Sequence, residues 1–177
     1  MSGVVRHRAL RRACVVRTAR RAAATLLGAV AIAVAIFPAA VRAADDLHLA
    51  PGLSFTDDSS DAFPIRGRHL DDATTGDGKA TIVFFGTSNC WNTNREAERL
   101  ISLYPKYKDR VRFVVVDVAH PSDAQKPLIE KHYKGAIPTV AVLAPDGSVL
   151  YDRAGETAAT RGDAQPLAAI IESALPK

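Results

Sequence analysis

The chain has 177 residues, enough for one ordinary domain with a sizeable core, and its formal net charge is +4. Its first 43 residues hold eight arginines and no acidic residue, so the other 15 basic residues face 19 acidic ones. The basic charge therefore belongs to the N-terminal segment, and it gives no evidence for a nucleic-acid partner.

Residues 1–43 have the features of an export signal. Arginines come first, an apolar stretch covers about residues 22–40, and small residues flank a cleavage-like motif that ends at Ala43. We expect cleavage after Ala43 and export of the remainder, with a bacterial periplasm or cell envelope as the favoured compartment. An uncleaved membrane anchor is the alternative, because the apolar stretch is nearly long enough to span a bilayer.

Residues 44–78 are predicted to form an irregular, loosely packed lead-in. They are rich in Asp, Ser, Thr and Gly and show little periodicity, with one short element expected around Phe63 to Leu70. Residues 79–177 are predicted to form the folded domain.

In that domain, segments with the apolar spacing of strands alternate with segments that have the apolar spacing of helices. Residues 80–85 and 111–118 are apolar runs typical of strands, and we expect the second to be a central strand covered on both faces. A helical stripe covers 92–104 and is expected to end at Pro105. The remaining elements expected are a helix at 122–133, strands at 139–143 and 148–151 joined by Pro145-Asp146-Gly147, and a last helix capped by Asp163. This order predicts an α/β fold, a mixed sheet with helices on both faces.

Cys90 lies where the first strand gives way to a helix, and export would remove Cys14, the other cysteine. Unpaired N–H groups and the positive end of the helix dipole favour a thiolate at such a position. Thr93 follows one helical turn later, and we expect its hydroxyl to reach back toward the sulfur as a donor. The polar neighbours of Cys90 favour an exposed, functional thiol over a buried, inert one.

Two segments resemble a known family. Residues 85–93 read FGTSNCWNT, and residues 137–139 read IPT. The first resembles the active-site segment of the thioredoxin family, with its W-C-x-x-C pattern, and the second resembles that family's cis-proline loop. Asp117 and the turn at 145–147 fit the same layout. The resemblance covers about residues 79–177 and implies a thioredoxin-like three-layer fold.

The resemblance also implies site residues. Cys90 would be the nucleophile, and the backbone at Ile137 and Pro138 would pair with a bound peptide. Thr93 is expected to be the second catalytic position because of its hydroxyl. The residues expected to bind substrate are Trp91, Asn92, Ile137, Pro138 and Thr139, although the Trp91 ring could instead be folded onto the surface.

Three departures from the family pattern stand out. Asn89 replaces the tryptophan before the cysteine, Thr93 replaces the resolving cysteine, and Phe84 stands where many thioredoxins carry a buried acid. The second thiol and the residue that handles its proton are therefore both missing.

These features predict a monothiol protein that forms mixed disulfides with clients carrying cysteines or disulfides, released by a second client thiol or an external thiol reductant. The alternative is a non-catalytic thioredoxin-like interaction module in which Cys90 is incidental. A peroxidase is a weaker alternative, because Thr87 to Cys90 matches T-x-x-C but Val83 replaces the expected proline. No metal or cofactor is expected, because His120 and His132 lack metal-ligand spacing.

Overall fold

The computed structural model describes residues 46–154 and 163–176. The predicted export signal at 1–43 lies outside the described residues. The elements are β1 (His48–Leu49), β2 (Ile65–Arg66), β3 (Thr81–Gly86), α1 (Trp91–Tyr107), β4 (Arg112–Asp117), the 3-10 turn η2 (Asp123–Gln125), α2 (Lys126–His132), β5 (Thr139–Leu143), β6 (Val149–Ala154) and α3 (Gln165–Ala174).

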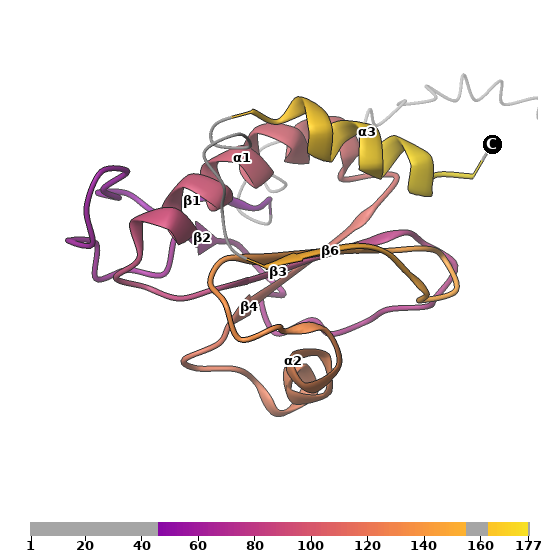
Figure 1. Cartoon of the computed structure of the whole chain (residues 1–177), viewed down its shortest axis with the longest axis horizontal. Coiled ribbons are helices and arrows are strands. Elements are labelled where there is room, and N and C mark those ends of the chain that lie inside the picture. Colours follow the sequence, from indigo (N-terminus) through magenta and orange to yellow (C-terminus); the bar gives the residue numbers. More distant parts are fainter. Residues whose placement is uncertain (1–45, 155–162, 177) are drawn as a thin grey trace, which may run out of the picture. The chain divides into compact units, whose positions relative to one another are not determined.

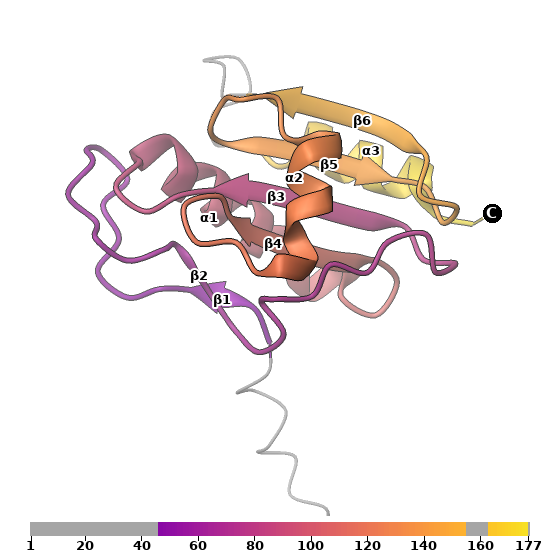
Figure 2. The same ribbon diagram turned by 90° about the horizontal axis from the view of Figure 1, so that it is seen from below.

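Four strands form a mixed sheet in the order β4-β3-β5-β6. β3 and β4 are parallel, whereas β5 is antiparallel to both β3 and β6. Helices α1 and α3 lie on one face of this sheet and α2 lies on the other (Figures 1 and 2). The predicted mixed sheet, covered by helices on both faces, is confirmed.

Each face of the sheet carries its own apolar core, because successive strand residues point to opposite faces. Phe84 packs with residues of α1 and α3, including Leu100 and Ile171. Phe85 packs with Leu128 of α2 and with Val116 of β4. Phe84 is thus a buried core residue at the position where the family resemblance would place an acid.

β4 is an edge strand of the described sheet, so its prediction as a central strand is wrong. Both of its faces are nevertheless covered, since Val115 joins one core cluster and Val114 the other. The sequence pattern therefore predicted the burial of both faces correctly, but burial of both faces does not determine whether a strand is central or at the edge of the sheet. Gln125 covers part of the open edge, where its side-chain Nε2 donates to the carbonyl of Val115 over 3.0 Å.

Pro105 lies inside α1, so the predicted helix end at this residue is also wrong. A proline removes one backbone N–H donor from the helix, yet the last turn persists. The Lys108 N–H donates to the Tyr104 carbonyl over 2.9 Å. Tyr107 is fully buried, and its hydroxyl donates to Glu172 of α3 over 2.9 Å. Burial of Tyr107 therefore holds the turn that the proline weakens.

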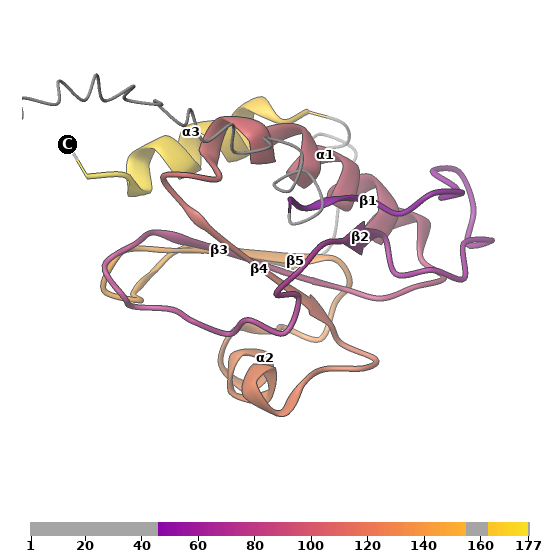
Figure 3. The ribbon, with the colours of Figure 1, turned by 180° about the vertical axis from the view of Figure 1, so that it is seen from behind.

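The lead-in is better packed than its composition suggested. β1 and β2 pair with each other, and β1 lies beside α1 (Figure 3). Ile65 is 0% exposed and belongs to the core cluster under α1 and α3. The Ala50 N–H donates to the Pro64 carbonyl over 2.8 Å, which joins the two arms of the lead-in. The short strands of the lead-in and Ile65 are therefore packed on the domain, whereas most other residues of 51–78 are exposed or half-buried.

No helix in the described part of the chain has the length and apolar character needed to cross a membrane. The apolar stretch at about 22–40 lies outside that part.

We predict that Ile65→Ala lowers the free energy of unfolding by about 2–4 kcal/mol, because it opens a cavity in a core cluster. Val149→Ala is the control and should cost less than about 0.5 kcal/mol, because Val149 is 48% exposed. Urea unfolding of both variants measures the difference. An Ile65→Ala cost as small as that of the control would contradict the packing of the lead-in on the core.

Candidate active site

Cys90 is the last residue of the short connection between β3 and α1. It is the N-cap of α1, with an extended backbone at φ −146 and ψ 104. Its thiol is free and the residue is half-buried. The predicted placement at a strand-to-helix junction is therefore confirmed. The Cys90 side chain makes no capping hydrogen bond to the first turn of the helix.

The turn before Cys90 depends on Asn89. Its φ of 54 lies in the left-handed region, which asparagine tolerates better than most residues. Its backbone N–H donates to the Ser60 carbonyl over 2.9 Å. With its side-chain amide oriented to satisfy both groups, Nδ2 donates to the same carbonyl over 2.7 Å and to Asp61 Oδ1 over 3.2 Å. The lead-in thus holds the backbone turn that precedes Cys90.

Thr93 faces the sheet and is 0% exposed. It packs directly over Gly86, where an added Cβ would lie 2.5 Å from Thr93 Cγ2. The Thr93 hydroxyl has no hydrogen-bond partner among the described residues. The expectation that it donates to the Cys90 sulfur is therefore wrong, because packing against Gly86 sets the orientation of the side chain.

The predicted proline loop lies at the same end of the sheet as Cys90. Phe85 pairs with Thr139, so Pro138 emerges opposite Gly86, where β3 turns toward the thiol. The peptide bond between Ile137 and Pro138 is cis. The pairing register of β3 and β5 therefore brings the Cys90 segment and the proline loop to the same end of the sheet.

The three residues of this loop differ in their exposure. Ile137 is half-buried and Pro138 is buried. Thr139 is 1% exposed, and its hydroxyl donates to the Ala136 carbonyl over 2.6 Å. The Thr139 side chain therefore stabilises the loop from within, and the surface that the loop offers includes Ile137.

Trp91 and Asn92, the other predicted binding residues, form the first turn of α1 and are half-buried. The Trp91 N–H donates to Asp58 Oδ1 over 2.8 Å. The guanidinium carbon of Arg95 lies 5.5 Å from the centre of the Trp91 ring, within reach of a cation–π interaction. Asn92 Oδ1 is buried and has no hydrogen-bond partner among residues 46–154 and 163–176.

Asp58, Ser60 and Asn94 are site residues that the sequence did not reveal. Asn94 Nδ2 donates to the Ser54 carbonyl over 2.7 Å, a third contact between the lead-in and this turn. Asp58 and Trp91 are 33 positions apart, so no local pattern could have linked them. The only sequence signal is the density of Asp and Ser in the lead-in, which is equally typical of a solvated loop.

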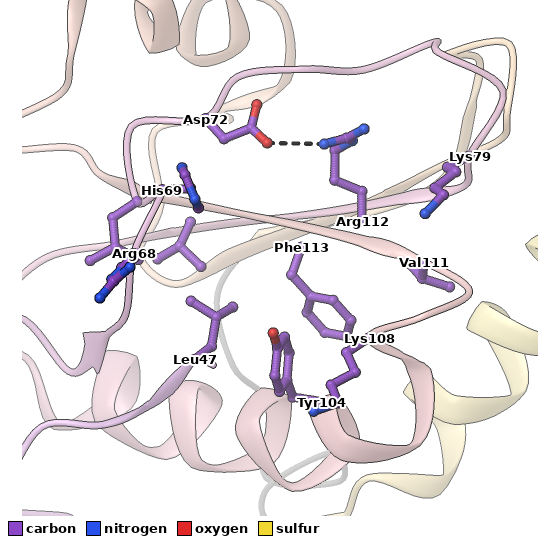
Figure 4. Close-up of a pocket in the computed structure, with 12 residues that line it drawn as sticks. Leu47, Arg68, His69, Asp72, Lys79, Tyr104, Lys108, Val111, Arg112 and Phe113 are labelled. Atoms are coloured by element: carbon purple, nitrogen blue, oxygen red, sulfur yellow. Dashed lines mark hydrogen bonds and ion pairs between the residues drawn. The ribbon is translucent and has the colours of Figure 1, made fainter. Parts of the chain in front are cut away.

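A pocket of about 210 Å³ lies along β4, between this edge strand, the lead-in and the end of α1 (Figure 4). It is lined at the start of β4 by Val111 and Arg112, and Arg112 pairs with Asp72 over 3.0 Å. None of the predicted site residues lines it. Because β3 and β4 are parallel, the start of β4 and the thiol beyond the end of β3 lie at opposite ends of the sheet.

The described residues contain no group of three or more His, Cys, Asp or Glu side chains arranged to hold a metal ion. His120 Nδ1 lies 3.2 Å from Asp117 Oδ2. His132 is buried, and this burial lowers its pKa from the ordinary value. The two histidines thus occupy separate environments.

The strand order β4-β3-β5-β6, the helix that follows β3 and the cis-proline at the start of β5 match the layout that the sequence resemblance implied. The fold is thioredoxin-like. No protein-family model matches the chain, and no curated protein matches it.

Several solved structures are similar to the chain. Fasciola hepatica thioredoxin is 21% identical, with a TM-score of 0.44, and the match covers 56% of this chain and 84% of that one. A putative thiol:disulfide interchange protein DsbE from Chlorobium tepidum is 19% identical, with a TM-score of 0.45 and coverage of 56% and 82%. Mitochondrial thioredoxin 3 from Saccharomyces cerevisiae is 21% identical, with a TM-score of 0.41 and coverage of 60% and 85%.

We predict that Thr93→Val raises the free energy of unfolding by about 1 kcal/mol, because it removes a buried hydroxyl that has no partner. Thr81→Val is the matched control. Thr81 is equally buried, but its hydroxyl donates to the Lys79 carbonyl over 3.3 Å, so this variant should lose stability.

The same Thr93→Val variant should react with iodoacetamide at Cys90 within about twofold of the wild-type rate, since no hydroxyl contact to sulfur is lost. A large drop in that rate, without a loss of stability, would show that the Thr93 hydroxyl acts on the sulfur after all.

Proposed function

We propose that this protein carries out thiol–disulfide exchange through a single thiol, Cys90, which forms mixed disulfides with client proteins. The observation that carries the proposal is the joint placement of Cys90 and the cis-Pro138 loop at one end of the sheet. A half-buried thiol at a helix N-terminus is accessible to a disulfide, and the neighbouring loop offers backbone to a bound peptide.

The exchange reaction is balanced without any cofactor. The Cys90 thiolate attacks one sulfur of a client disulfide, a bond forms between them, and the client's S–S bond breaks. The second client sulfur leaves as a thiolate. A later attack on the mixed disulfide, by that thiolate or by an external thiol reductant, restores Cys90. No electrons are gained or lost overall when the client's own thiolate closes the cycle.

The absence of a second thiol determines which outcome is favoured. Thr93 occupies the position of a resolving cysteine, and the only other cysteine of the chain is Cys14 in the predicted export signal. The adduct on Cys90 therefore awaits a thiol from outside this site. That requirement suits disulfide isomerisation, client retention or removal of glutathione better than net oxidation or reduction.

The client-binding residues of this proposal lie on both sides of Cys90. On one side, Trp91 and Asn92 in the first turn of α1 would contact the client. On the other side, the backbone of Ile137 and Pro138 would pair with it. Thr139 supports that loop through its hydroxyl bond to Ala136. The partners are client proteins that carry cysteines or disulfides, together with an external thiol reductant.

Export to a periplasm or cell envelope is part of the proposal and rests on residues 1–43 alone. Disulfides persist in such a compartment, so a lone thiol there meets disulfide-bonded clients.

A non-catalytic thioredoxin-like interaction module is the second candidate, and one observation favours it. Asp58, rather than the sulfur of Cys90, accepts the Trp91 N–H at the start of α1. A thiol that receives no hydrogen bond from the helix lacks one source of activation.

Refolding of ribonuclease with scrambled disulfides distinguishes the two candidates. The assay uses the full-length chain with Cys14→Ser, so that Cys90 is the only thiol of the protein. We expect recovery of ribonuclease activity about tenfold faster than with the Cys14→Ser, Cys90→Ser control, because only a thiolate can start exchange. Equal rates for the two proteins would contradict the exchange function and leave the interaction module.

A further inference from the structure

The segment 54–61, here called the acidic loop, is bound to the residues on both sides of Cys90. It accepts hydrogen bonds from Asn89 at the Ser60 carbonyl and from Trp91 at the Asp58 carboxylate. Asn94, one turn into α1, adds its bond to Ser54. A segment about 30 positions earlier in the chain thus contacts the residues before and after the thiol.

The acidic loop has a defined shape of its own. The Ser54 N–H donates to the Ser60 hydroxyl, which closes the loop at its base, and Ser60 is buried. Asp57 Oδ1 accepts the Ser59 N–H over 3.0 Å, and the Asp57 N–H donates to the Ser54 hydroxyl over 3.2 Å. These bonds fix the backbone around Asp58, so its carboxylate is held in place.

Asp58 therefore places a negative charge beside the backbone of the residue that follows the reactive Cys90. Its Oδ1 lies 2.8 Å from the backbone nitrogen of Trp91, the residue that follows Cys90. Asp61 contributes a second carboxylate beside Asn89, the residue before Cys90. Arg95, which lies over the Trp91 ring, is the cation closest in sequence to this turn. A carboxylate fixed at this turn repels an anion that approaches Cys90 and attracts a cation.

We infer that Asp58 is a specificity-determining residue, whose charge makes Cys90 select disulfides flanked by lysine or arginine and reject anionic disulfides and thiols. The inference rests on the proposed exchange function and adds a substrate class to it. Of the three outcomes named for that function, it favours isomerisation and client retention over removal of the anionic glutathione. Asp58 is not bonded to the reacting sulfur atoms, so it acts as a positioning residue. It accepts the Trp91 N–H at the start of α1 and sets the electrostatic field at that turn.

The charge of Asp58 can be tested separately from its hydrogen bond. Asp58→Asn keeps an oxygen that can accept the Trp91 N–H but removes the charge. Asp57→Asn is the matched control, because the Asp57 carboxylate bonds within the loop and not to α1. Hydrogen bonds from Ser59 and Ser54 lower the pKa of Asp57, so the control also removes a full charge.

The measurement is the ratio of two alkylation rates at Cys90 in the full-length Cys14→Ser chain. Iodoacetate is an anion and iodoacetamide is neutral, and both attack the same thiolate. We expect Asp58→Asn to raise the iodoacetate-to-iodoacetamide ratio about threefold or more, and Asp57→Asn to change it less. A purely structural role of Asp58 would change both rates together and leave the ratio constant.

Salt dependence of the unsubstituted protein supplies an independent measurement should Asp58→Asn fail to fold. Raising the ionic strength from about 0.01 M to 1 M shortens the screening length from about 30 Å to 3 Å, so the wild-type ratio should rise toward that of free cysteine. A ratio that is insensitive to salt and equal to that of free cysteine would overturn the inference.

The cationic disulfide cystamine and the anionic disulfide of glutathione then test the substrate class directly. Wild-type protein should form the mixed disulfide with cystamine faster, and Asp58→Asn should reduce that preference. If Cys90 reacts readily but without charge preference, the inference on Asp58 is wrong and the exchange function stands. If Cys90 reacts with neither disulfide in either protein, the exchange function itself is wrong.

Discussion

The close packing of Thr93 on Gly86 determines the geometry of this site. Because Gly86 has no side chain, the first turn of α1 approaches the end of β3 closely, and an added Cβ would be 2.5 Å from Thr93 Cγ2. This contact seats α1 on the sheet and leaves Cys90 at the start of the helix, half-buried. The antiparallel pairing of Phe85 with Thr139 then brings the cis-Pro138 loop to the same end of the sheet as Cys90.

The same contact explains the chemistry that we propose. A residue that fills the position of a resolving thiol, and turns its methyl group toward Gly86, supplies neither a second sulfur nor a donor to the first. Two features near Cys90 then matter to the proposal: the backbone of the cis-Pro138 loop, and the Asp58 carboxylate that accepts the N–H of the next residue, Trp91. The first supports client binding, and the second supports discrimination between clients by charge.

Much of the fold follows from local sequence patterns. β5 occupies the predicted residues 139–143, and the other main-sheet strands were located to within a few residues, because β-rich apolar runs bounded by turns are strong signals. The junction at Cys90 and the proline loop were likewise predictable from two short motifs. The resemblance to the thioredoxin family supplied the idea that these motifs meet, and the strand register agrees with it.

The failures share one cause, which is that nonlocal packing overrides local preference. Pro105 is a strong local stop signal, but burial of Tyr107 against α3 continues the helix. The lead-in has the composition of a loop, yet Ile65 belongs to a core cluster, and Leu47, Leu49 and Phe63 pack against that cluster. The Asp58 contact joins residues 33 positions apart, so no pattern within a short window could specify it. Thr93 and Gly86 are close in the sequence, but the orientation of Thr93 depends on how α1 packs on the end of β3.

The lifetime of a mixed disulfide on Cys90 tests the central claim most directly. The full-length Cys14→Ser chain and its Thr93→Cys variant are treated with dipyridyl disulfide, and intact mass is followed over time. We predict that the first protein keeps one thiopyridyl group until an external thiol is added. The variant should lose the group and become an internal disulfide, two hydrogens lighter than the dithiol. A Cys14→Ser chain that never accepts the group, or a variant that keeps two free thiols, would contradict the account.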